Sequence, residues 1–129
     1  ILVEGLNHTG VLPALAEVLK RATAASPHAT AWGAGIITAF ASNLINNLPM
    51  GLIAATTTHT AQSSPHITGA VLIGVDLGPN LSVTGSLATI LWLVALRREK
   101  IEVGAWPFLK LGMLVTPPAL IAALAAAIR

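Results

Sequence analysis

The stretch Ser42–Pro49, which reads SNLINNLP, lies between two apolar segments, Ala31–Ser42 and Met50–Ala55. As a helix the first segment covers about 18 Å, which is too short to cross a hydrocarbon core of about 30 Å. Two short apolar arms around a polar, proline-bearing tip predict a re-entrant helical hairpin over residues 29–60. The alternative is one long helix that is kinked at Pro49.

A second interruption lies within the apolar segment 67–96, where Asp76–Asn80 reads DLGPN. As one continuous helix this segment covers about 45 Å, which is more than the hydrocarbon core requires. Pro79 removes a backbone donor, and Gly78 frees the backbone from the usual steric limits. We therefore predict a broken transmembrane helix, with two half-helices around an unwound centre.

The composition points to a lipid environment. The chain has 129 residues, of which 54% are hydrophobic and 9% are charged, whereas a soluble domain carries about 25% charged residues. The absence of cysteine excludes a disulfide framework and a thiolate metal site. The formal charge of +2 includes no basic patch for nucleic acid. The predicted fold class is an all-α integral membrane protein.

The N-terminal residues 1–28 are expected to hold the end of a membrane helix and a turn at Gly10–Pro13. A short amphipathic helix follows at Pro13–Arg21, lies at the membrane surface, and ends at Ala24–Pro27. The chain starts without an initiator methionine or a basic region, so we expect no signal peptide. An apolar start of this kind favours a piece of a longer protein.

The C-terminal part is expected to form a charged loop at Arg97–Lys100 and a last transmembrane helix over residues 106–128. Trp106 would lie at the membrane interface, Lys110 would extend towards it, and Pro117–Pro118 would bend the helix. A hairpin returns to its own side and one crossing follows it, so Lys20–Arg21 and Arg97–Lys100 should lie on opposite faces. The positive-inside bias favours the second cluster as cytoplasmic.

The two interruptions carry the candidate chemistry. Irregular backbone at membrane depth survives where protein buries it or where it lines a wet cavity, and transporters use the free ends of half-helices to bind solutes. The tip offers hydroxyl and amide groups, and two of its amides are four residues apart, as on one helix face. The alternative role is helix capping. The candidate binding residues at the tip are Ser42, Asn43, Asn46 and Asn47.

The second interruption contains an acid and several further polar groups. Asp76 is the one acid inside the long apolar segments, and a carboxylate there needs a partner, water or a proton. We predict proton or cation coupling for it, with a capping role as the alternative. Gly78, Asn80 and Ser82 are further candidate binding residues, whereas Thr84 and Ser86 fit hydrogen bonding to helix carbonyls equally well.

Other polar residues fit structural roles better. His59 and His66 are expected to be loop residues, because their spacing fits no helical face and no third metal ligand is evident. Thr56–Thr58 fits a helix end, and a Glu4–His8 pair fits packing within a larger protein. We expect no cofactor, no metal and no enzymatic activity, since no nucleophile–base pair is present.

Two stretches resemble a known family. Ser42–Met50 resembles the asparagine-rich hairpin of the arsenite and antimonite efflux permeases, and Gly74–Trp92 resembles the broken helix that follows it there. Val3–Asn7 is similar too, although it is less distinctive. These permeases belong to the ion transporter superfamily, whose members are built from two inverted repeats. The resemblance implies that the chain is most of the second repeat and forms the C-terminal part of such a permease.

The resemblance implies a substrate and partners. The substrate would be trivalent arsenic or antimony hydroxide, exported from a bacterial cell across its inner, or plasma, membrane by antiport of protons, with Asp76 as the proton carrier. The partners would be the lipid bilayer, the N-terminal part of the permease and the ATPase subunit that some arsenite permeases have. A sodium/proton antiporter on the same scaffold is one alternative function. A membrane module that assembles a complex without transporting anything is the other.

Overall fold

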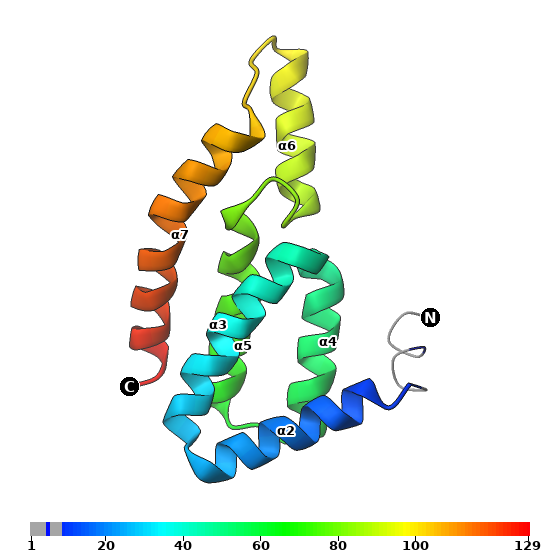
Figure 1. Cartoon of the computed structure of the whole chain (residues 1–129), viewed down its shortest axis with the longest axis vertical. Helices are drawn as coiled ribbons and strands as arrows, with labels where there is room; N and C mark the ends of the chain where they lie inside the picture. The colour runs from blue at the N-terminus through cyan, green and yellow to red at the C-terminus, as the bar shows by residue number, and fades with distance from the viewer. Residues whose placement is uncertain (1–4, 6–8) are drawn as a thin grey trace.

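A computed structural model describes Gly5 and residues 9–129, and within them the chain is helical and contains no strand. This confirms the all-α part of the predicted fold class. The predicted Glu4–His8 pair and most of the predicted membrane helix before Gly10 lie outside the described residues. The elements, arranged as in Figure 1, are α2 (Val11–Ala25), α3 (Pro27–Ile45), α4 (Asn47–Thr60), α5 (Pro65–Leu77), the 3-10 helix η1 (Gly78–Leu81), α6 (Leu87–Arg98) and α7 (Ala105–Ala127).

The amphipathic helix α2 lies across one end of the molecule (Figure 1). It buries Leu12 and Ala16, and its exposed face carries an ion pair in which Arg21 Nε donates to Glu17 Oε1 at 2.9 Å. Its predicted end is confirmed: the last helical residue is Ala25, and the hydroxyl of Ser26 then accepts from the backbone of Ala29 to begin α3. The predicted turn is shorter than expected, because Pro13 already lies in the first turn of α2.

Helices α3 and α4 form a hairpin whose tip is at Asn46, so a single helix kinked at Pro49 is excluded. Pro49 is the third residue of α4, where its missing N–H costs no helical bond. Both arms are longer than predicted. With 19 residues, α3 covers about 28 Å, so the predicted reason for re-entrance, a short arm, is wrong. Thr56–Thr58 lies towards the end of α4, as predicted.

The broken helix consists of α5, η1 and α6, and its irregular part lies further along the chain than predicted. Asp76 is still in α5, and Gly78 has ordinary right-handed helical angles, φ −54° and ψ −45°. The expectation that Gly78 frees the backbone is therefore wrong. The chain becomes extended at Ser82, and helix resumes after Ser86, whose hydroxyl accepts from the backbone N–H of Ala88 at 3.2 Å.

The long helix α7 is, among the described residues, the one helix that is long and apolar enough to cross a membrane. It begins beside Trp106 as predicted, and Lys110 Nζ lies 5.5 Å from the centre of the indole ring. Figure 1 shows α7 changing direction along its length, which fits the two prolines inside it at 117 and 118.

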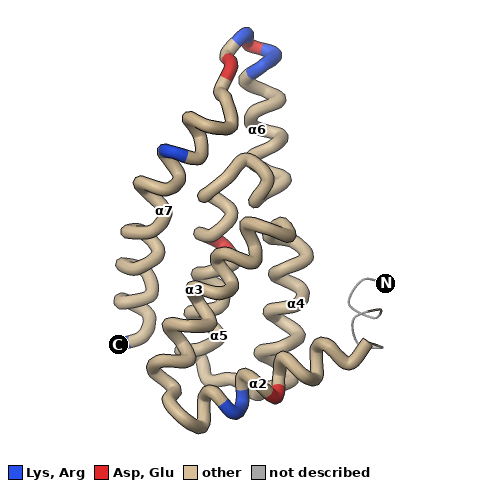
Figure 2. Tube along the Cα trace, viewed as in Figure 1, with Lys and Arg blue, Asp and Glu red and all other residues tan. Residues whose placement is uncertain are grey.

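Most charged residues of the described chain lie at two ends of the molecule, one on α2 and the other at the connection between α6 and α7 (Figure 2). The clusters Lys20–Arg21 and Arg97–Lys100 thus lie at opposite ends of the molecule (Figure 2), and their placement on opposite faces of a membrane stays a prediction. The second cluster is only partly a loop, because Arg97 and Arg98 are the last two residues of α6.

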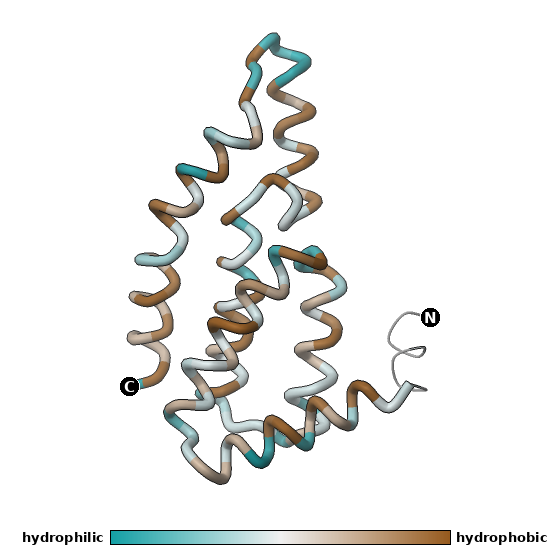
Figure 3. Tube along the Cα trace, viewed as in Figure 1, coloured by the Kyte–Doolittle hydropathy of each residue, from teal (hydrophilic) through white to brown (hydrophobic). Residues whose placement is uncertain are grey.

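The tightest packing is between α3 and α5, where small residues bring the two backbones together. A Cβ atom added to Gly74 would overlap the carbonyl oxygen of Gly35 and the hydroxyl of Thr38, and one added to Gly78 would overlap the backbone of Ala39. Hydrophobic residues recur along all the helices (Figure 3), and many large apolar side chains are exposed, with Leu44 81% and Leu114 72% exposed. Such a surface requires lipid or further protein to cover it.

Candidate functional site

The tip of the hairpin is a strained turn at Asn46. Its backbone angles, φ 74° and ψ 149°, lie in a region that favours glycine. Its side chain caps α4 by accepting from the backbone N–H of Leu48 at 3.4 Å. The chain reverses direction here, so Asn43 and Asn47 do not share a helix face as expected, and belong instead to the end of α3 and the start of α4. The predicted capping alternative is thus realised at Asn46.

The hairpin tip is hydrogen-bonded to the segment between α5 and α6, residues 78–86, which we call the break. The hydroxyl of Ser82 donates to Asn43 Oδ1 at 2.8 Å, although the two residues are 39 positions apart. The backbone N–H of Asn47 donates to the carbonyl oxygen of Gly85 at 3.1 Å, and Asn46 Nδ2 lies 3.5 Å from the carbonyl oxygen of Thr84. We call this cluster, together with Asn80 two residues before Ser82, the tip–break junction: Asn43, Asn46, Asn47, Asn80, Ser82 and Thr84.

Gly85 allows the junction to close. A Cβ atom at this position would overlap the backbone of Pro79 and would lie 2.7 Å from Asn43 Oδ1. On the break itself, the hydroxyl groups of Ser82 and Thr84 are 3.2 Å apart. Asn80 folds back on the end of α5, where its Nδ2 donates to the carbonyl oxygens of Asp76 and Leu77 at 3.3 and 3.2 Å.

Two of the predicted site residues lie beneath the junction, inside the contact between α3 and α5. Ser42 has no exposed surface, and its hydroxyl donates to the carbonyl oxygen of Ala39 at 3.0 Å and approaches that of Gly74 at 3.4 Å. Gly78 is buried against Ala39. Both residues thus contribute to the contact between the hairpin and the broken helix.

The carboxylate of Asp76 is exposed on the last turn of α5. No hydrogen bond or ion pair joins it to any residue that the structure describes. A free carboxylate on an otherwise apolar helix is costly in lipid and is a typical feature of a functional site.

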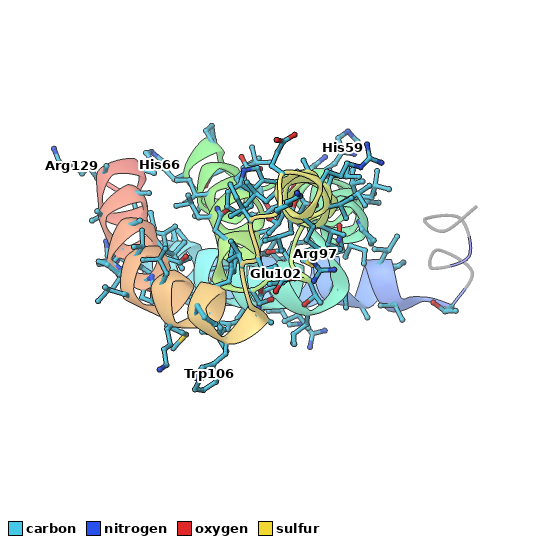
Figure 4. All side chains as sticks on the ribbon, turned by 90° about the horizontal axis from the view of Figure 1, so that it is seen from above. His59, His66, Arg97, Glu102, Trp106 and Arg129 are labelled. Atoms are coloured by element: carbon cyan, nitrogen blue, oxygen red, sulfur yellow. The ribbon has the colours of Figure 1, made fainter. Side chains whose placement is uncertain are left out.

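His59 and His66 lie in helices and are far from each other (Figure 4). His59 lies in the last turn of α4 and His66 in the first turn of α5, so the expectation of loop histidines is wrong in detail. Figure 4 shows them at different sides of the molecule. His66 Nδ1 approaches the carbonyl oxygen of Ala127 at 3.2 Å. No group of three metal-ligating side chains occurs in the described part of the chain.

A large apolar cavity lies away from the polar groups of the junction. It has a volume of about 540 Å³ and lies between α2, α3 and α4, where apolar side chains such as Leu19, Ile37 and Ile53 line it. The tip–break junction is instead an open, half-buried surface of amides and hydroxyls. Such a surface can exchange hydrogen bonds with a small polar solute, and it includes no charged side chain.

The sequence-based prediction missed Gly35, Ala39 and Gly74 as contact residues and gave Gly78 a different role, that of freeing the backbone. Gly35, Ala39, Gly74 and Gly78 follow a four-residue spacing on the facing sides of α3 and α5. Small residues at this spacing are typical of close helix–helix contacts in membranes, so the signal was available. Gly112 carried no such local signal, because its contact is with the break rather than with another helix.

Fold and site together define a class: an all-helical membrane protein in which two polar interruptions of apolar helices are bonded to each other. The family model described as "Arsenical pump membrane protein" matches residues 1–128. The chain belongs to the arsenical pump membrane protein family.

Curated relatives agree with this assignment. The chain is 34% identical over 130 aligned positions to the arsenical pump membrane protein of Yersinia enterocolitica and to that of Escherichia coli (strain K12). In both comparisons 98% of this chain is aligned, and it spans 30% of the length of the relative. No solved structure gives a significant match to the chain.

Asn46 provides a test of the strained tip. We expect Asn46→Ala to lower the stability of the full-length protein by about 1 kcal/mol, because the cap is lost while the positive φ remains. Asn46→Gly should be at least as stable as the parent, since glycine adopts this conformation without strain and loses only a few tenths of a kcal/mol as a cap. Thermal unfolding of the purified protein in detergent measures both.

The matched control is Asn47→Ala. The structure assigns a hydrogen bond to the backbone of Asn47 and none to its side chain among the described residues, so the unfolding temperature should not change. Equal stabilities of Asn46→Ala and Asn46→Gly would show that the tip does not hold Asn46 at positive φ.

Proposed function

We propose that this chain is the C-terminal part of a secondary transporter that exports arsenite or antimonite across the bacterial plasma membrane. The observation that carries the proposal is the tip–break junction, in which Ser82 of the break donates to Asn43 of the hairpin. Irregular backbone from two apolar segments meets there and presents amides and hydroxyls, as expected for a solute site at membrane depth. Membership of a family named for an arsenical pump supports the choice of solute.

The chemistry of the junction suits this solute. At neutral pH trivalent arsenic is an uncharged polyol, which needs hydrogen-bond donors and acceptors rather than a counter-charge. Amide and hydroxyl groups supply both. A cage of thiolates would hold trivalent arsenic too tightly for release, and the chain contains no cysteine. The junction is therefore suited to transient binding.

The proposed site residues divide by position. Asn43, Asn46, Asn47, Asn80 and Ser82 surround the junction and contact the solute directly. Ser42 and Gly78 belong to the same site but support it from the α3–α5 contact beneath. Thr84 contributes its hydroxyl beside Ser82.

Asp76 is the proposed proton carrier. It lies one helical turn before Asn80, whose side chain donates to the backbone carbonyl oxygen of Asp76, so the proposed carrier adjoins the break. In this proposal the solute is exported in exchange for inward-moving protons. Sodium/proton antiport uses the same residues as oxygen ligands and is the alternative.

The transport cycle requires more protein than this chain. In our proposal the hairpin α3–α4 is re-entrant, the helix α5–α6 crosses with its break near the midplane, and α7 crosses back. The remaining N-terminal part of the permease supplies an inverted counterpart, and the two alternate access to the junction. An ATPase subunit is a further proposed partner.

The side chain of Asn47 tests the site, because its loss leaves the junction intact. In everted membrane vesicles that carry the full-length protein, Asn47→Ala should raise the apparent KM for arsenite about tenfold, the effect of losing one hydrogen bond of about 1.4 kcal/mol. Thr60→Ala, on the exposed far end of the same helix, is the matched control and should not change it. An unchanged KM in Asn47→Ala would reduce the tip to a structural role.

The alternatives predict different results in the same cells. Expression should raise tolerance to arsenite and not to sodium, and the reverse would favour the sodium/proton antiporter. A module that only assembles a complex would raise neither, and a thiol placed by Asn80→Cys would then be unreactive from both sides of the membrane.

A further inference from the structure

The last helix packs against the break and approaches its backbone closely at a glycine. Gly112 of α7 is buried. A Cβ atom added there would lie 2.5 Å from the carbonyl oxygen of Leu81, 2.9 Å from that of Asn80 and 3.0 Å from the carbonyl carbon of Leu81. All three are backbone atoms, which cannot rotate away as a side chain would. Any side chain at position 112 must therefore move α7, the break or both.

The break is held from two sides. On one side α3 contacts it through Gly78 and Gly85, which lie against Ala39 and Asn43. On the other side α7 contacts it through Gly112 at the carbonyl groups of Asn80 and Leu81. Ser82 follows Leu81 directly. The distance between α7 and the break therefore affects the position of the Ser82 hydroxyl relative to Asn43.

Besides packing along α5, α7 makes two close contacts near the ends of its buried face, which consists of Gly112, Thr116, Leu120 and Leu124. The second contact is at the other end of this face, where Leu124, fully buried, packs against Gly35 of α3 so closely that a Cβ there would lie 2.6 Å from Leu124 Cδ2. The same helix is thus fixed against α3 near one end and against the break near the other. A displacement of α7 is transmitted to the junction.

We propose that Gly112 is a positioning residue for the solute site, because the absence of a side chain there allows α7 to press the break against the hairpin tip. The effect on transport rests on the proposed function, whereas the effect on geometry does not. Gly112 touches no solute and acts through the Asn80 and Leu81 carbonyl groups.

The geometric test is a cross-link across the junction. In a cysteine-free full-length protein, Asn43→Cys combined with Ser82→Cys should react efficiently with a short bis-thiol reagent. Adding Gly112→Ala should lower the cross-linked fraction, and Gly112→Val should lower it further. Gly33→Ala in α3 and Gly69→Ala in α5 are the matched controls, since a Cβ at either position meets nothing within 4 Å. The controls should cross-link as the parent does.

The transport test separates positioning from general damage. With native residues at the junction, Gly112→Ala should raise the apparent KM for arsenite several-fold at an unchanged amount of inserted protein, with a smaller fall in kcat. If Gly112→Val fails to insert, the alanine variant decides. Unchanged cross-linking in the inserted Gly112 variants would overturn the inference. Reduced cross-linking with an unchanged KM would support the positioning role and would instead contradict the proposal that the junction binds the solute.

Discussion

Replacing Gly74 by alanine is expected to separate α5 from α3 and to lower the stability of the protein by about 1–3 kcal/mol, the usual range for overpacking. The added Cβ would overlap the carbonyl oxygen of Gly35 and the hydroxyl of Thr38, and would lie 3.0 Å from the backbone nitrogen of Ala39. Two of these atoms belong to the α3 backbone, so the helices themselves must move. Thermal unfolding and the yield of inserted full-length protein measure the loss.

The control for this substitution lies on the same helix. Gly69 is also in α5, but a Cβ there meets nothing within 4 Å. Gly69→Ala should be neutral or stabilising by up to about 1 kcal/mol, because alanine is the better helix former. Equal stability of Gly74→Ala and Gly69→Ala would contradict the close α3–α5 contact in which Ser42 and Gly78 lie.

Asp76→Asn is expected to abolish the proton-driven part of arsenite export while the protein still inserts. The substitution keeps the size and the polar character of the side chain and removes only its ability to carry a proton. The carboxylate is exposed and has no partner among the described residues, so its loss breaks no contact there. Arsenite uptake into everted vesicles, driven by an imposed pH gradient, measures the effect.

Two further variants make this result interpretable. Asp76→Glu retains a carboxylate and should retain part of the activity. Glu17→Gln removes an acid at the exposed ion pair with Arg21 on α2, and should leave the pH-driven export unchanged. Uptake by Asp76→Asn at the level of the parent would exclude a role for Asp76 in coupling.

The sequence-based prediction of the broken helix was right about its existence and inaccurate about its position. Gly78 and Pro79 were expected to unwind the chain from Asp76 onwards, yet α5 continues to Leu77 and η1 continues to Leu81. Packing explains the difference. Gly78 lies against Ala39 in an ordinary helical conformation, so a residue expected to free the backbone serves to bring two helices together.

The prediction of the hairpin was likewise right about its existence and inaccurate about its extent. Three asparagines and a proline within an apolar stretch correctly predicted a tip, and Pro49 occupies the first turn of α4, where proline is tolerated. The lengths of the arms could not be predicted as well. Ser42 and Asn43, polar enough to end a helix locally, stay in α3, where Ser42 bonds to the backbone of its own helix and reaches α5.

By itself the sequence determined that the chain is helical, apolar, charged at two opposite ends and interrupted twice, because composition, proline and helix caps act over a few neighbouring residues. Only the tertiary structure decided that the two interruptions meet, with Ser82 bonded to Asn43 across 39 positions, and that Gly74, Gly78, Gly85 and Gly112 set how closely they do so. The physical reason is that a hydrogen bond or a steric contact between residues distant in sequence depends on where whole helices pack. A pattern of a few neighbouring residues does not determine that packing.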